Sequence, residues 1–185
     1  MGAELGFGED GDGGGDGLGE DTDSDGDTDT YPAPEEADGG LYDPYGELIW
    51  QDPPPPELMY QTEAHDYCLD LVHGGHDDWR LPLVNELRTL LRGCDLSDCA
   101  VDDESCIDVS CNDHPSCLGC GFLQGPAADG CYWSGWLSGW CEAYWTDTVA
   151  PPLGYRAWLV DFRTAGIAAQ DQIWGNGVRC VRDPS

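Results

Sequence analysis

The chain contains no lysine, and its seven arginines are its only permanently basic side chains. They face 37 acidic residues, which gives a formal net charge of −30 at pH 7. Nucleic acids and anionic membranes are bound through clustered Lys and Arg, so a chain of this charge repels both. The composition therefore argues against these two partners and is compatible with divalent cations.

The sequence also lacks any apolar run that approaches the ~18 residues of a membrane-spanning helix. Its first ten residues, MGAELGFGED, have neither the basic nor the apolar region of a signal peptide. The cysteines described next imply export, so we expect that a signal has been removed or that the start is incomplete. We therefore expect an extracellular or outer-surface protein, with a lipid anchor on the missing segment as one arrangement.

Ten cysteines lie between Cys68 and Cys180. An even number in a loop-rich region predicts disulfides formed in an oxidising compartment, and we favour this over zinc because C-x-x-C occurs only once. Cys68, on a predicted helix, and Cys180, on the predicted last strand, are the two cysteines outside the cysteine-rich segment 93–143, so we predict that they are bonded to each other. We expect the other eight to pair among themselves, with several pairings open: Cys94, Cys99, Cys106, Cys111, Cys117, Cys120, Cys131 and Cys141.

Residues 1–38 contain 14 acidic and no basic residues among repeated Gly, Asp and Thr. Such a segment cannot bury enough apolar surface to fold, so we expect a disordered acidic linker. The spacing of Asp21, Asp23 and Asp25 begins like a calcium-binding loop, but Pro32 stands where the loop requires Glu. An acidic spacer is our preferred interpretation, and weak calcium binding by the three aspartates is the alternative. No other cofactor is expected.

Residues 39–185 contain the signals of regular structure. Turn residues before Leu48-Ile49-Trp50 indicate a hairpin or short strand. A helix is predicted from a Thr62 cap to the stop at Gly74 and Gly75, with a buried apolar stripe formed by Ala64, Tyr67, Cys68, Leu71 and Val72. A second helix is predicted from Leu83 to Gly93, with one apolar face formed by Leu83, Leu87, Leu90 and Leu91.

Residues 93–143 are predicted to be a cysteine-rich insertion with little regular structure. Strands are predicted at AYWTDT, RAWLVDF, IAAQDQIW and GVRCVRD, with a turn that ends at Gly166. In the second of these strands, alternation places Trp158, Val160 and Phe162 on one face, opposite Ala157, Leu159 and Asp161.

Several blocks, in this order, resemble the Lcl C-terminal domain family: YDPYGELIWQD, EAHDYCLDLVHGGHDDWRLPLVNELRTLL, YWTDT, AWLVDF and GVRCVR. The resemblance covers about residues 39–183, interrupted by the insertion. It implies an α+β, C-type-lectin-like fold, in which two helices pack on a small twisted antiparallel sheet. It also implies secretion or surface attachment, and the best-known member is an adhesin that binds sulfated polysaccharide.

The chain departs from this family in two respects. Leu83 stands where the family usually has Thr, so the capping box keeps only Glu86, at an expected cost of about 1 kcal/mol. Residues 39–185 carry seven arginines and 23 acidic residues, a charge of −16, which argues against a sulfated polyanion as ligand.

The Trp79-Arg80-Leu81-Pro82 corner is interpreted as structural. We expect Trp79 to fill the gap between the second helix and the sheet. We expect Arg80 to bond backbone carbonyls or an acidic neighbour, and Pro82 to set the chain's entry into the helix.

Candidate ligand-binding residues are aromatic, because aromatic rings stack on the apolar faces of sugars. Trp136 and Trp140 are flanked by Gly and Ser, and Trp174 lies beside Asn176. For most of the aromatic residues near the insertion, packing in the core is the preferred interpretation.

No catalytic motif is present, and Cys180 is the only cysteine in the last forty residues, whereas formylglycine-generating enzymes use two near that end. We therefore expect a non-enzymatic, lectin-like module that binds a carbohydrate or a surface protein. A structural or protein-interaction domain of the cell envelope is the alternative. An oxidoreductase of the formylglycine-generating type, which requires free thiols, is the least favoured.

Overall fold

The computed structural model describes residues 35–37, 39–94, 117–150 and 154–184, all within the unit Pro32–Ser185. Within these ranges the chain has a mixed α+β fold, as predicted, with two helices and two antiparallel sheets where one sheet was predicted. Neither helix in the described ranges is long and apolar enough to span a membrane. Several predictions lie outside the described residues, namely those for Asp21, Asp23, Asp25, Cys99, Cys106 and Cys111.

The first sheet joins the two ends of the described chain. It has the order β1-β2-β3-β7 and is formed by β1 (Glu35–Ala37), β2 (Gly40–Asp43), β3 (Leu48–Gln51) and β7 (Val181–Arg182). The β2–β3 pair is the predicted hairpin. β7 has two residues and is shorter than predicted, while β1 places three residues of the expected linker in a strand.

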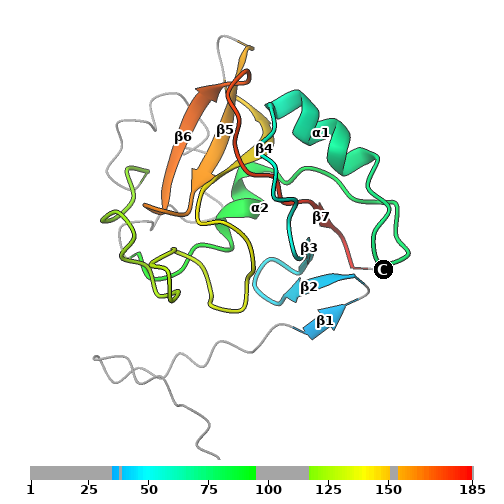
Figure 1. Ribbon diagram of the computed structural model, residues 1–185, viewed down its shortest axis with the longest axis horizontal. Helices are drawn as coiled ribbons and strands as arrows, with labels where there is room; N and C mark the ends of the chain where they lie inside the picture. The colour runs from blue at the N-terminus through cyan, green and yellow to red at the C-terminus, as the bar shows by residue number, and fades with distance from the viewer. Residues whose placement is uncertain (1–34, 38, 95–116, 151–153, 185) are drawn as a thin grey trace, which may run out of the picture. The chain divides into compact units, whose positions relative to one another are not determined.

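The second sheet is a meander of β4 (Ala143–Val149), β5 (Arg156–Asp161) and β6 (Gly166–Asp171). All three strands were predicted, and so was the turn that ends at Gly166. Figure 1 shows this sheet beside α1 (Gln61–Leu69), with β1, β2 and β3 at the opposite end of the domain. The two sheets are bridged where Tyr144 of β4 pairs with Gly177, four residues before β7.

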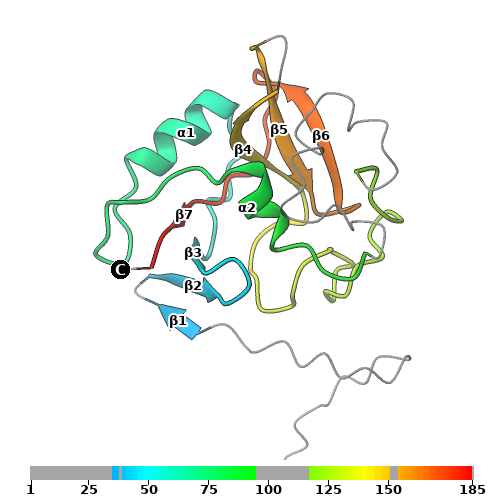
Figure 2. The same cartoon turned by 180° about the vertical axis from the view of Figure 1, so that it is seen from behind.

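The core has two parts, one on each face of β5. Trp158, Val160 and Phe162 belong to one cluster, while Ala157 and Leu159 belong to the other. This confirms the predicted alternation, and burial of both faces explains why the strand contains so few polar residues. Figure 2 shows α2 (Val84–Arg88) between the two sheets, where its apolar side packs in the first cluster.

α1 is shorter than predicted. It begins after Tyr60 rather than at a Thr62 cap, because the Glu63 carboxylate accepts a hydrogen bond from the Tyr60 amide at 3.0 Å. It ends at Leu69, so Val72 lies outside the helix and is 74% exposed instead of buried. The two glycines expected to stop the helix instead form a tight turn with φ values of 63° and 83°, closed by reciprocal bonds between His73 and His76.

α2 is also shorter than predicted, since bonds from each amide to the third preceding carbonyl replace the helical pattern after Arg88. Leu83 is exposed, contrary to prediction, whereas Leu87 and Leu90 are buried. Glu86 keeps its half of the capping box and accepts from the Leu83 amide at 2.7 Å. The Val84 amide donates to the Thr148 hydroxyl of β4 at 3.1 Å, so a distant strand supplies part of the missing cap.

The corner before α2 is structural, as predicted, although its tryptophan packs elsewhere. Arg80 makes two parallel bonds to the Glu86 carboxylate, both 2.7 Å, and pairs through its backbone with Val181. Trp79 is 1% exposed, but it packs in the cluster that contains Cys68 of α1 rather than against α2. This cluster contains residues of β4 and β5, as the prediction of packing against the sheet requires, whereas the buried residues of α2 belong to the other cluster. Pro82 is buried at the entry to α2.

Three disulfides join described residues. Cys68–Cys180 links α1 to the segment before β7 and confirms the prediction, while Cys94–Cys120 and Cys131–Cys141 lie within the insertion. Of the insertion predicted at residues 93–143, the described residues 93–94 and 117–142 form neither helix nor strand, and β4 begins at its last residue, Ala143. Several disulfides are typical of domains that fold in an oxidising compartment, which is consistent with an extracellular domain.

Candidate functional site

The tryptophans divide sharply between core and surface. Five of the eight are no more than 2% exposed, namely Trp50, Trp79, Trp133, Trp145 and Trp158. Of the predicted ligand-binding residues, Trp136 is partly buried against the first cluster, and its indole nitrogen is inaccessible to solvent. Trp136 is therefore less exposed than its Gly and Ser neighbours suggest.

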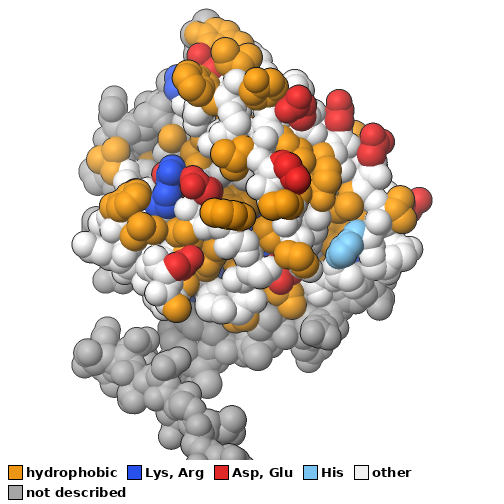
Figure 3. Space-filling view, in the orientation of Figure 1, with side chains coloured by type: hydrophobic (Ala, Val, Ile, Leu, Met, Phe, Trp, Pro, Cys, Tyr) orange, Lys and Arg blue, Asp and Glu red, His pale blue; other side chains and the backbone are white. Residues whose placement is uncertain are grey.

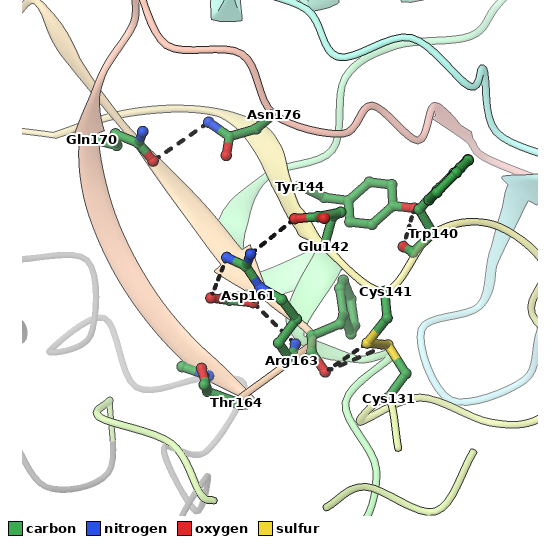
Figure 4. Close-up of polar contacts among 12 residues, drawn as sticks. Cys131, Trp140, Cys141, Glu142, Tyr144, Asp161, Arg163, Thr164, Gln170 and Asn176 are labelled. Atoms are coloured by element: carbon green, nitrogen blue, oxygen red, sulfur yellow. Dashed lines mark hydrogen bonds and ion pairs between the residues drawn. A yellow bond between two sulfur atoms is a disulfide. The ribbon is translucent and has the colours of Figure 1, made fainter. Parts of the chain in front are cut away.

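Trp140 and Trp174 are 67% and 59% exposed. Trp140 is held through its backbone, because its carbonyl accepts a bond of 2.8 Å from the Tyr144 hydroxyl. In Figure 4 its indole ring points away from Arg163. Of the three predicted tryptophans, Trp140 and Trp174 thus have rings available to a ligand. The fourth predicted residue, Asn176, is 9% exposed.

A pocket of about 640 Å³ lies over the β4–β5–β6 sheet, on the face that carries Leu159. Its floor consists of small or apolar side chains, Ala143, Leu159 and Ala168, contributed by one strand each. Gly175 and Asn176 form part of its wall, and in the chain they directly follow the exposed Trp174. The volume is within the usual range for a small-molecule site, about 300–1,000 Å³.

Arg163 fixes one end of this pocket. Its guanidinium makes two bonds to Asp161, of 2.8 and 2.9 Å, and a third of 2.9 Å to one oxygen of Glu142 (Figure 4). The hydrogen bonds to Asp161 raise the pKa of Arg163 above its ordinary value, so the group stays charged at any physiological pH. The three bonds hold both carboxylates in fixed positions and balance much of their charge.

The wall nearest Asn176 is uncharged. The Asn176 side-chain amide donates a long hydrogen bond of 3.5 Å to the side-chain oxygen Oε1 of Gln170, and both residues line the pocket (Figure 4). Within the described part of the chain, the other two amide atoms, Gln170 Nε2 and Asn176 Oδ1, have no protein partner. This wall therefore offers one donor and one acceptor to a ligand.

All seven arginines are described, and each has a structural position. Arg88, Arg179 and Arg182 are buried, at 6%, 1% and 1% exposure. The other four lie within 4 Å of a carboxylate: Arg80 with Glu86, Arg92 with Asp43, Arg156 with Asp171 and Arg163 with Asp161. On the face in Figure 3, blue side chains are few and adjoin red ones. The described residues therefore form no basic patch for a polyanion.

Cys131 and Cys141 are not available as metal ligands. Asp129, Cys131 and Cys141 bring three ligand-type atoms within 4.8 Å of one another. Both sulfurs belong to the Cys131–Cys141 disulfide, and a metal ligand must be a thiolate. This cluster therefore stabilises the insertion.

Sequence reasoning did not identify Glu142, Arg163 or Gln170 as residues of a site. One signal was present: alternation placed Asp161 on the same strand face as Leu159, although a carboxylate on an apolar face requires a partner. Arg163 follows two residues later and supplies that partner.

The comparison with protein families agrees with the resemblance seen in the sequence. The Lcl C-terminal domain family matches residues 39–182, which is most of the chain and nearly all of the described fold. No curated protein sequence matches the chain significantly. The chain therefore belongs to the Lcl C-terminal domain family.

Proposed function

We propose that this chain is a secreted or surface-attached, non-enzymatic module with a C-type-lectin-like fold, which binds a carbohydrate or another surface ligand. The observation that carries the proposal is the exposure of Trp140 and Trp174 in a domain that buries five of its eight tryptophans. An exposed indole forgoes burial of a large apolar surface, and exposed aromatics commonly mark binding sites. Attachment would be through an N-terminal segment, with a lipid anchor as one form.

The disulfide arrangement supports a module without enzymatic activity. Catalysis of the formylglycine-generating type requires reactive thiolates, and Cys180 is bonded to Cys68. Both sulfurs lie in a fully buried part of the core, where a reductant has little access. The pair therefore serves stability.

The proposal is tested on a glycan array and on intact cells with the fluorescently labelled chain. We expect binding that Trp140→Ala or Trp174→Ala weakens at least tenfold, whereas Tyr45→Ala, which changes an aromatic residue that is 55% exposed in the β2–β3 turn, leaves it unchanged. Absence of binding to every glycan and every cell surface would overturn the proposal. Far-UV circular dichroism of each variant shows whether it is folded.

A second candidate function is protein interaction, and one surface favours it. The backbone bonds of Met59 with Asn176 and of Gln61 with Gln172 bring residues 58–61 beside residues 172–176. Four exposed apolar side chains gather there, namely Leu58 at 59%, Tyr60 at 50%, Ile173 at 73% and Trp174 at 59%. Loss of cell binding in Ile173→Asp, with glycan binding retained, would favour this function.

A further inference from the structure

We infer that the pocket over the β4–β5–β6 sheet is a subsite for an uncharged, hydroxyl-rich saccharide unit. This inference rests on the proposed function and names a ligand class and a position for it. The floor of the pocket consists of small or apolar side chains, and its walls are polar. A pyranose ring presents the same combination, since its C–H faces are apolar and its edge carries hydroxyls.

The charges that line the pocket cancel. Glu142, Asp161, Arg156 and Arg163 line the pocket, so its lining carries two negative and two positive charges in a domain whose net charge is −16. An anionic ligand would compete for Arg163 with the Glu142 and Asp161 carboxylates, which already accept three bonds of 2.8–2.9 Å from it, and for Arg156 with its partner Asp171. Displacing any of these bonds leaves a carboxylate unpaired, so the pocket discriminates against sulfated and carboxylated sugars.

The remaining polar atoms are both donors and acceptors. Gln170 Nε2 can donate, while Asn176 Oδ1 and the second Glu142 oxygen can accept, and within the described residues none of these three has a partner. A hydroxyl both donates and accepts, so it satisfies such a mixed set without adding charge. Arg163 acts as a positioning residue, since it holds Glu142 at the pocket and uses three of its five N–H groups on carboxylates.

The inference is tested by titrating the full chain with neutral cello-, manno-, xylo- and chito-oligosaccharides, and with heparin as the sulfated probe. We expect at least one neutral series to bind and heparin not to bind. Gln170→Ala should weaken that binding about five- to tenfold, the size expected for loss of one uncharged hydrogen bond. Ala168→Trp, which fills the pocket from an exposed position on its floor, should abolish it.

Ala128→Trp is the matched control, because Ala128 is an exposed alanine in the insertion loop that does not line the pocket. The inference is overturned if heparin binds and the neutral sugars do not, or if neutral sugars bind equally to wild type, Gln170→Ala and Ala168→Trp. In the latter case the proposed function survives, provided that Trp140→Ala or Trp174→Ala weakens binding. Failure of every glycan and cell surface to bind overturns both.

Discussion

Arg179 is buried to 1% exposure between the two sheets. It donates to the Gln51 carbonyl at 2.9 Å, to Asp52 at 3.0 Å and to the Ser138 carbonyl, and its guanidinium lies over the Trp133 ring. One side chain thus ties the end of β3 to the insertion. One of the chain's seven arginines thus places its positive charge in the core.

Replacing Arg179 with Met should lower the free energy of unfolding by about 3–5 kcal/mol, because Asp52 would lose its buried partner. Urea unfolding followed by tryptophan fluorescence measures this change. Arg156→Met is the control, since that side chain is one-third exposed and its carboxylate pair should contribute no more than about 1 kcal/mol. Equal losses in the two variants would contradict the assignment.

The buried hydroxyl of Tyr144 should make the free energy of unfolding depend on pH in the alkaline range. Burial raises the pKa of its hydroxyl above the ordinary value, even though Arg179 opposes the shift. The unfolded chain then releases this proton at lower pH than the folded chain does. The contribution of the protonated Tyr144 hydroxyl to the free energy of unfolding is therefore complete below about pH 10, the ordinary tyrosine value, and is lost as the pH rises above it.

Tyr144→Phe should remove part of this alkaline loss, although it lowers stability at neutral pH by about 1 kcal/mol because the bond to the Trp140 carbonyl is lost. Thermal unfolding from about pH 8 to about pH 11, a range that spans the ordinary tyrosine value, measures both effects. Tyr155→Phe is the matched control, since Tyr155 is 54% exposed. If both variants retain the wild-type pH dependence, Tyr144 is not its source.

At the scale of elements, α2 shows how the fold tolerates a poor local sequence. Leu83 offers no hydrogen-bond acceptor from its side chain, yet the helix start is held by Glu86 and by Thr148 of β4. Arg80 holds Glu86 in turn through two bonds of 2.7 Å. The helix of five residues is too short to be stable alone and depends on these tertiary contacts.

Leu83→Thr should therefore raise the free energy of unfolding by about 1 kcal/mol, since a threonine hydroxyl at this position caps a further amide of the first turn. Leu83 is 43% exposed, so the change removes little buried apolar surface. The measurement is the urea midpoint, with Val72→Thr as a control at an exposed position outside any helix. A loss of stability in Leu83→Thr would show that the leucine packs more than its exposure indicates.

At the scale of the whole molecule, the Cys68–Cys180 disulfide closes a loop that contains most of the domain. Its two cysteines are 112 residues apart and both are fully buried, whereas Cys94 and Cys120 are 26 residues apart. A crosslink that closes a longer loop restricts the unfolded chain more, which predicts the larger contribution for the first pair.

The double variant Cys68→Ala, Cys180→Ala should lose about 4–5 kcal/mol, and Cys94→Ala, Cys120→Ala about 3–4 kcal/mol. Urea unfolding under non-reducing conditions gives both values. A larger loss from the Cys94–Cys120 pair would show that the insertion, rather than the helix-to-strand connection, limits the stability of the domain.

Much of the fold was predictable because its signals are local. The two faces of β5, the β2–β3 hairpin and the Arg80–Glu86 contact follow from residues within a few positions of one another. The lengths of the helices were not predictable, since α1 ends where the chain turns toward its tertiary neighbours. The pocket was not predictable either, because Glu142, Arg163 and Asn176 come from three separate segments.

The sequence by itself determined the charge, the disulfide character and the alternating strands, because composition and the two-residue period of a strand require no knowledge of distant neighbours. It therefore argued against a polyanion as ligand, and it predicted the bridge between Cys68 and Cys180 that the structure contains. Only the tertiary structure decided which tryptophans face solvent and which carboxylates neutralise Arg163. Exposure and charge balance depend on contacts between residues far apart in the chain, and such contacts exist only once the two sheets have packed.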